Sequence, residues 1–165
     1  MENFSVLVSD GLEEEGLELL RKVASVTVDA KITPEDLMKV LPEYDALIVR
    51  SRTKVTKDVL LASKRLKVVG RAGVGVDNID LKAAKDAGVM VVNSPLAATN
   101  AVAELALGYM LSLARRIPEM NNSMKAEKWE KSSFKGGELE GKTLGLLGLG
   151  RIGAHVAELA NAFGM

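Results

Sequence analysis

Apolar and polar positions follow two alternating patterns over the first part of the chain. Short apolar runs predict five strands, at residues 4–8, 25–28, 45–50, 66–71 and 89–93. Segments with apolar residues at helical spacing separate them and predict four helices, at residues 16–23, 34–41, 55–64 and 80–88. This alternation predicts an α/β fold with a parallel sheet, and the nearly continuous apolar strands predict helices on both sheet faces.

The pattern changes at Ser94-Pro95, which interrupts the alternation. Residues 99–116 predict one long helix that is apolar almost all round. We therefore expect this helix to be buried on several sides and to bridge to a second lobe. Pro118 marks its approximate end. The more polar stretch that follows, residues 121–141, is expected to begin as a helix and to continue as a linker.

Composition removes several classes of function. The 165 residues include 22 Lys and Arg against 22 Asp and Glu, so nothing draws the whole chain to nucleic acid or to an anionic membrane. Without cysteine there is no disulfide and no thiolate zinc site, which is compatible with the cytoplasm. The start of the chain lacks the pattern of a signal peptide. The longest apolar stretch, residues 101–114, is interrupted by Glu104 and is shorter than the ~20 residues of a membrane span.

The last segment predicts a strand at residues 142–147, a glycine turn and a helix at residues 152–163. The turn matches the pattern G-x-G-x-x-G of dinucleotide-binding proteins. Gly148 permits the tight turn, Gly150 lets a pyrophosphate approach the backbone, and Gly153 lets the helix pack closely on the strand. The free amides and dipole of the helix N-terminus favour phosphate.

A turn between strand and helix that binds no ligand is the alternative interpretation of this motif. The acidic residue that would bind the ribose is expected ~20 residues further on, after Met165. The choice between NAD and NADP therefore stays open.

A second glycine loop lies between the fourth predicted strand and the helix that follows it. Gly73 and Gly75 leave consecutive backbone amides exposed, which suits an anion such as a carboxylate. A plain connection between strand and helix explains the composition equally well.

Five segments in register give the chain a wider resemblance. They are LIVRSRTKVT, VVGRAGVGVDNIDLKAA, VVNSP with AELALGYMLSLAR, KWEKSSFKGGELEGKTLGLLGLGRIG, and ANAFGM. Together they resemble the D-isomer-specific 2-hydroxyacid dehydrogenases, and most of all those that act on D-3-phosphoglycerate. The resemblance implies a flavodoxin-like substrate-binding lobe at residues 1–98, a crossover helix at residues 99–120, and at residues 121–165 the incomplete start of a Rossmann NAD-binding lobe, with its first βα unit.

The same resemblance assigns binding roles. Arg50 and Arg52 would hold the substrate phosphate, to which the guanidinium fork is suited, although a solvated strand end is the alternative. The substrate carboxylate would be received by amides of the second glycine loop, at Gly73, Val74 and Gly75.

The cofactor NAD would contact both lobes. Val74 and Thr99 would face the nicotinamide side, and Thr99 is also a candidate N-cap of its helix. Where relatives have Asn-Thr this chain has Ala98-Thr99, which weakens that contact. The pyrophosphate would lie on the glycine turn, at Gly148, Gly150, Arg151, Ile152 and Gly153.

The catalytic arginine, carboxylate and histidine of the family would all follow Met165, so this chain carries none of them. His155 is expected to be a partly exposed helix residue. Glu104 is expected to favour the dipole or bind amides near a helix start, and Asp77 and Asp80 to be turn and cap residues. Pro34 is expected in a first helical turn and Gly88 at a helix end.

The implied activity of the full-length parent is oxidation of D-3-phosphoglycerate to 3-phosphohydroxypyruvate with NAD, the first step of serine biosynthesis. A glyoxylate, hydroxypyruvate or D-lactate reductase of the same family is one alternative. A binding or dimerisation module without catalysis is another. The parent is expected to be a cytoplasmic homo-oligomer, a dimer or tetramer, that binds a small phosphorylated 2-hydroxy acid and no metal. Trp129 is either an interface anchor or folded back on its own lobe.

Overall fold

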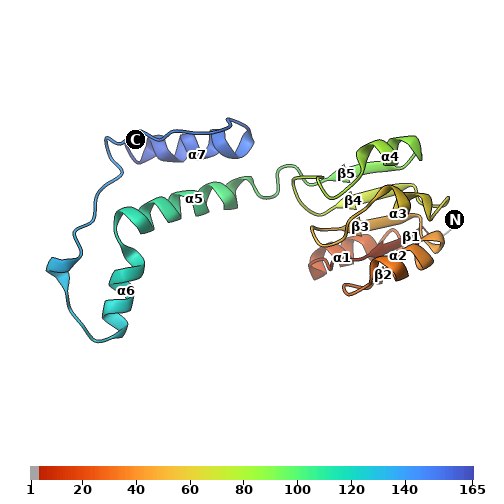
Figure 1. Cartoon of the computed structure of the whole chain (residues 1–165), viewed down its shortest axis with the longest axis horizontal. Coiled ribbons are helices and arrows are strands. Elements are labelled where there is room, and N and C mark those ends of the chain that lie inside the picture. Colours follow the sequence, from red (N-terminus) through yellow and green to blue (C-terminus); the bar gives the residue numbers. More distant parts are fainter. Residues whose placement is uncertain (1–3) are drawn as a thin grey trace. The chain divides into compact units, whose positions relative to one another are not determined.

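The computed structural model describes residues 4–165. Residues 1–3 lie outside the described residues, and so does that part of the expectation that the start of the chain lacks the pattern of a signal peptide. The chain divides into two compact units, unit 1 at Met1–Pro95 and unit 2 at Leu96–Met165 (Figure 1). Each unit is built around its own apolar cluster.

Unit 1 contains one sheet of five parallel strands. These are β1 (Ser5–Val8), β2 (Ser25–Val28), β3 (Ala46–Val49), β4 (Val68–Arg71) and β5 (Met90–Asn93). Their order in the sheet is β2-β1-β3-β4-β5, the order of flavodoxin-like folds. The predicted α/β class, the five strands and the parallel sheet are confirmed.

Four α-helices and one 3-10 helix connect the strands. They are α1 (Glu14–Arg21), α2 (Pro34–Val40), η1 (Leu41–Glu43), α3 (Lys57–Leu61) and α4 (Leu81–Asp86). Side chains cap three of them, because Thr33, Thr56 and Asp80 each accept a hydrogen bond from an amide in the first helical turn. Pro34 in a first turn and Asp80 as an N-cap are thus confirmed. Gly88, with φ +70°, follows α4 as predicted.

Helices cover the two faces of the sheet unequally. On one face, α2, α3 and α4 pack over strand residues that include Leu7, Leu47 and Val69. On the other face, α1 places Leu17 against β1 and β3. The alternation of side chains along each strand explains why neighbouring residues belong to different clusters.

Unit 2 is built on two helices that lie side by side, α5 (Thr99–Ala114) and α7 (Arg151–Ala162) (Figure 1). Ala103 and Leu107 of α5 pack with Val156 of α7 and with Leu139. After α5 the backbone turns at Arg116, whose φ is +55°, and continues as α6 (Ile117–Lys125) and η2 (Lys131–Ser133).

Three expectations for unit 2 are wrong. Residues 142–147 form no strand, because no neighbouring segment within residues 4–165 supplies their backbone with a partner. Thr99 is not an N-cap: Ala98 holds that position, and the Thr99 hydroxyl lies within the helix and finds no hydrogen-bond partner among the described residues. Glu104 lies beyond the first turn of α5, with an exposed side chain.

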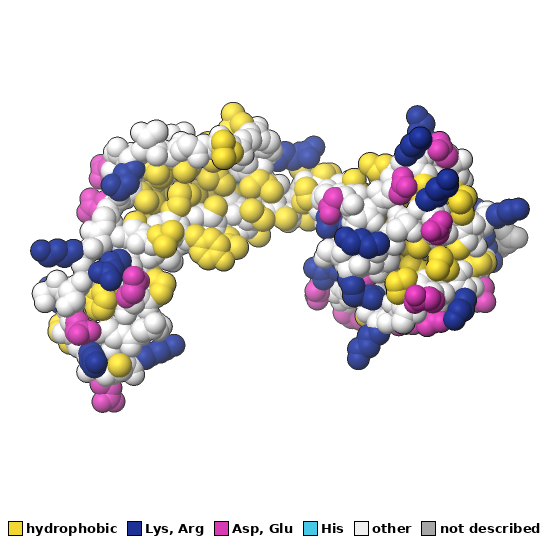
Figure 2. Space-filling view, in the orientation of Figure 1, with side chains coloured by type: hydrophobic (Ala, Val, Ile, Leu, Met, Phe, Trp, Pro, Cys, Tyr) yellow, Lys and Arg dark blue, Asp and Glu magenta, His cyan; other side chains and the backbone are white. Residues whose placement is uncertain are grey.

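The long helix is also less buried than its sequence predicts. An apolar row on α5, here called the α5 stripe and made of Val102, Leu105, Tyr109 and Leu113, is exposed. Figure 2 shows hydrophobic side chains gathered along α5 and α7. The reason is that, of the helices in unit 2, α7 alone packs along the length of α5 in the described part of the chain. No helix within residues 4–165 is long and apolar enough to cross a membrane.

Candidate functional site

The carboxyl ends of four strands lie level with one another in unit 1. The register pairs Val8 with Ile48, Val49 with Arg71, and Arg71 with Asn93. The chain leaves β1 and β3 at the point where the strand order reverses direction. In open parallel sheets, this is where ligands bind.

One carboxylate organises the loop after β3, residues 50–53, here called the arginine loop. Asp10, just after β1, accepts the backbone amides of Arg50 at 2.7 Å and Thr53 at 3.0 Å through Oδ2. Its Oδ1 accepts the Thr53 hydroxyl and lies 3.2 Å from an Arg52 nitrogen. Burial raises the pKa of Asp10, but these hydrogen bonds and the Arg52 charge outweigh it, so the pKa lies below its ordinary value.

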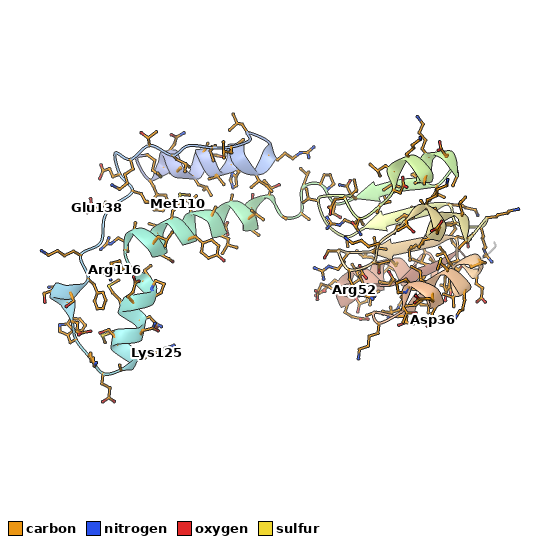
Figure 3. All side chains as sticks on the ribbon, in the orientation of Figure 1. Asp36, Arg52, Met110, Arg116, Lys125 and Glu138 are labelled. Carbon is orange, nitrogen blue, oxygen red and sulfur yellow. The ribbon has the colours of Figure 1, made fainter. Side chains whose placement is uncertain are left out.

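Some of the hydrogen-bond donors of Arg52 are already used by contacts within unit 1. Its guanidinium donates hydrogen bonds to the carbonyl oxygens of Ile32 and Ser9 and pairs with Asp10. Figure 3 labels Arg52 in unit 1. The Arg52 side chain is nevertheless half exposed. Since a guanidinium has five N–H donors, some remain for a ligand. Arg50 is exposed, and its backbone rather than its side chain makes the contacts that fix the loop.

The other side of the arginine loop is held through its carbonyl groups. The buried Asn78 donates its side-chain amide to the oxygens of Arg50, at 2.9 Å, and Thr53, at 2.7 Å. Arg71 donates Nε–H to the Arg50 oxygen at 3.3 Å. Loop amides therefore face Asp10, and loop carbonyls face Asn78 and Arg71.

The second glycine loop adjoins this arrangement. A Cβ on Gly73 would stand 2.8 Å from an Arg71 guanidinium nitrogen, and one on Gly75 would stand 2.9 Å from an Asp77 carboxylate oxygen. Only glycine allows these approaches without a shift. Asn93 anchors the loop by donating to the Val74 oxygen at 2.6 Å.

The amides of this loop differ in their availability. The Gly73 amide already donates to the Arg71 oxygen at 2.9 Å. Within residues 4–165, the amides of Val74 and Gly75 find no hydrogen-bond acceptor. An anion at this loop would therefore be received by Val74 and Gly75.

In unit 2 the glycine turn has the form that a phosphate site needs. Gly148 has φ +97°, a conformation that residues with side chains rarely adopt, and a Cβ on Gly153 would lie 2.4 Å from the Gly148 oxygen. A Cβ on Gly150, at the N-cap of α7, would meet nothing within 4 Å, so the backbone is open to an incoming group there.

A hollow of about 500 Å³ lies beside this turn, between the first turns of α5 and α7. Thr99 and Arg151 line it, together with His155. The unpartnered Thr99 hydroxyl is a buried polar group that a bound polar molecule could satisfy. These residues fit a dinucleotide. His155 is a partly exposed residue of α7, and its Nδ1 lies 3.0 Å from Oε2 of Glu158, three residues further along the same helix.

Asp10, Asn78 and Arg71 are the residues of this site that the sequence patterns missed. Asp10 lies two residues after β1, Arg71 ends β4, and Asn78 lies in the connection from β4 to α4, each without a motif spacing. The signal that could have found Asp10 is its position as the polar residue that closes an apolar strand at a carboxyl end. Asp77 and Asp80 have no catalytic arrangement around them, and no cluster within residues 4–165 could hold a metal ion.

The family is decided by a direct match. A model described as the D-isomer specific 2-hydroxyacid dehydrogenase catalytic domain matches residues 6–162. The chain belongs to the D-isomer specific 2-hydroxyacid dehydrogenases. The resemblance inferred from the sequence is therefore confirmed, and the chain is part of an oxidoreductase family.

Individual members of this dehydrogenase family are similar over nearly the whole chain. A D-3-phosphoglycerate dehydrogenase of Synechocystis is 51% identical over 160 residues, covering 97% of this chain and 29% of that protein. A hydroxypyruvate reductase of Thermotoga maritima is 49% identical over 166 residues, covering 100% of this chain and 54% of that protein.

A solved structure supports the fold. The NAD+-bound 3-phosphoglycerate dehydrogenase of Entamoeba histolytica matches with a TM-score of 0.77 and 30% identity, over 99% of this chain and 52% of that one. The chain thus spans between 29% and 54% of the length of these three relatives.

Proposed function

We propose that a protein containing this chain oxidises D-3-phosphoglycerate to 3-phosphohydroxypyruvate with NAD, the first step of serine biosynthesis. The observation that carries the proposal is the arginine loop at the β1–β3 switch point. Arg50 is exposed there, and Arg71, which binds the Arg50 oxygen, also approaches Gly73 of the second glycine loop. A substrate with a phosphate at one end and a carboxylate at the other matches this pairing of guanidinium groups and amides.

Unit 1 would serve as the substrate lobe and bind the two ends of the substrate separately. Arg50 would contact the phosphate, with the remaining donors of Arg52 as a second contact. The Val74 and Gly75 amides would receive the carboxylate. This division of roles leaves the C2 carbon between two fixed anchors, and fixed anchors orient a substrate for reaction.

Unit 2 would start the cofactor lobe, with α5 as the crossover. The glycine turn, with Arg151 and Ile152, would hold the pyrophosphate, while Thr99 and Val74 would approach the nicotinamide. NAD, when bound, accepts the hydride that leaves C2. The proton of the C2 hydroxyl must pass to a base.

Steady-state kinetics of the full-length protein test this proposal. We expect a lower KM for D-3-phosphoglycerate than for glycerate or lactate. Arg50→Ala should raise the KM for D-3-phosphoglycerate by roughly 10- to 100-fold and change kcat less, because a charge-assisted hydrogen bond is worth about 1.5–3 kcal/mol. Lys64→Ala, an exposed cation outside the loop, is the matched control and should change neither constant. A wild-type enzyme with no preference for phosphorylated substrates would disprove the proposal.

Reduction of hydroxypyruvate is the second candidate, favoured by the identity to the Thermotoga maritima enzyme. Such a substrate has no phosphate for Arg50 to bind. The same assays decide between the two, because Arg50→Ala would then leave the KM for hydroxypyruvate nearly unchanged.

A binding or dimerisation module is the third candidate, favoured by the exposed α5 stripe and by Trp129, whose side chain is largely exposed. Light scattering of the 165-residue chain tests it. A concentration-independent monomer would exclude self-association. Calorimetry with NAD should then give weak binding or none, since the chain presents the glycine turn without a paired strand before it.

A further inference from the structure

Four donors converge on the Asp10 carboxylate. They are the Arg50 amide, the Thr53 amide, the Thr53 hydroxyl and the Arg52 guanidinium. The carboxylate side chain is only 2% exposed. An ionised carboxylate offers about four acceptor sites, so these donors saturate it. Asp10 therefore has no capacity left to bind a substrate directly.

The hydrogen bond between the hydroxyls of Ser9 and Thr53, beside Asp10, has a defined donor and acceptor. Because the carboxylate can only accept, the Thr53 hydroxyl must donate to Asp10. The Ser9 hydroxyl, 3.0 Å from Thr53 Oγ1, is then the donor of that second contact, which is shorter than its 3.4 Å approach to the Ile48 oxygen. The chain Ser9 to Thr53 to Asp10 connects the end of β1 to the arginine loop.

We propose that Asp10 is a positioning residue that holds the arginine loop in the conformation in which Arg50 binds the phosphate end of the substrate. The loop contains two cationic side chains, and Asp10 is the anion placed among them. By binding backbone amides on the Arg50 side and the guanidinium on the Arg52 side, it directs the first side chain outward and keeps the second beside the sheet.

Replacing Asp10 by asparagine, which is neutral and of nearly the same size, breaks this arrangement without leaving a cavity. In Asp10→Asn one oxygen becomes an NH₂ group, which cannot accept a hydrogen bond. If this group takes the Oδ1 position it faces the Thr53 hydroxyl and Arg52, and if it takes the Oδ2 position it faces two amides. Either orientation sets donor against donor.

The kinetic test uses the full-length protein and rests on the proposed function for the identity of the substrate. Asp10→Asn should raise the KM for D-3-phosphoglycerate about tenfold, the equivalent of about 1.4 kcal/mol. The KM values for NAD and glycerate, and kcat, should stay within about twofold. Thr53→Val, which removes one donor, should give a smaller effect in the same direction.

Asp45→Asn is the matched control. Asp45 is a second buried and fully paired carboxylate, bound by Ser5, Arg65 and Lys67, but it lies at the opposite, amino end of β3. Its substitution should lower the melting temperature and leave the ratio of the KM for D-3-phosphoglycerate to the KM for glycerate unchanged. In an enzyme that prefers D-3-phosphoglycerate to glycerate, an unchanged ratio in Asp10→Asn, or an equal rise in the KM for NAD, would overturn the positioning role.

Hydrogen exchange separates this inference from the proposed function. In Asp10→Asn, the amides of Arg50 and Thr53 should exchange at least tenfold faster, while those of β1 and β3 stay protected. A wild type without preference for phosphorylated substrates would sink the proposed function alone. Unchanged exchange at Arg50 and Thr53 would sink the positioning role, whatever the substrate proves to be.

Discussion

The two units of this chain use their apolar side chains in opposite ways. In unit 1, Leu7, Leu47 and Val69 are almost completely buried between a sheet and its helices. In unit 2, Leu113 is 80% exposed and Leu147 is fully exposed, although both units have apolar sequences. The difference teaches that apolar content alone does not bury a residue, and that a strand or helix face needs a neighbour supplied by the rest of the fold.

Strand pairing and the cover of helices explain the burial of apolar side chains in unit 1. Each of its five strands is paired, and the helices that connect them return to cover the faces. In unit 2 the segment before the glycine turn has no strand beside it within residues 4–165, and the α5 stripe has no helix over it. The exposed stripe has the character of surfaces that associate with other protein surfaces.

A pair of leucine substitutions tests the comparison with the largest expected effect. Leu47→Ala should lower the free energy of unfolding of unit 1 by about 2–5 kcal/mol, because it leaves a cavity in a closed core. Leu113→Ala should change stability by less than about 0.5 kcal/mol. Urea unfolding, followed by hydrogen exchange in each unit, measures both. Equal effects would mean that α5 is buried in solution, by self-association for example.

The glycine turn gives the next largest effect. Gly153→Ala should destabilise the packing of α7 by roughly 1–3 kcal/mol, because its methyl group would overlap the Gly148 oxygen. Gly108→Ala, in the open middle of α5, is the control and should stabilise the helix by about 0.5–1 kcal/mol. Thermal melts of both variants compare them. If Gly153→Ala melted like the wild type, close approach would not be the reason for this glycine.

A pH titration provides the smallest effect and concerns unit 1. Hydrogen bonds from Arg65, from the Ser5 amide and from Lys67 hold the pKa of Asp45 well below its ordinary value. Its stabilising contribution is therefore complete above the ordinary aspartate pKa, about 4, and is lost as the pH falls toward the folded-state value. Asp45→Asn should thus be less stable than the wild type at pH 7, and the difference should shrink near pH 2. Urea midpoints at both pH values measure this, and a constant difference would contradict it.

Local patterns predicted unit 1 well because each strand that they indicate finds its partner strands within the described residues. Each strand and helix has its own period, and caps such as Asp80 act within one turn. The strand predicted at residues 142–147 failed because strand formation depends on a partner elsewhere, which no local window contains. Thr99 failed as a cap because the turn before it starts the helix one residue earlier.

The site was predictable to the level of its loops and not of its network. The two arginines and the two glycine loops stand out as motifs in the sequence. Asp10 and Asn78 lie about 40 and 25 residues from their partners along the chain, and a single polar residue carries no period. Their roles arise from the sheet order, which brings the ends of β1 and β3 together. The binding roles of the arginines and glycines stay predictions.

The frame of the arginine loop has a consequence for how this enzyme family can change. Asp10, Asn78 and Arg71 hold residue 50 through its amide and its carbonyl, which every amino acid except proline supplies alike. The side chain at position 50 is therefore free to vary while the backbone keeps its shape. A single codon change there can therefore alter the side chain that this loop presents to solvent while the fold stays the same, which makes position 50 a practical first target for engineering.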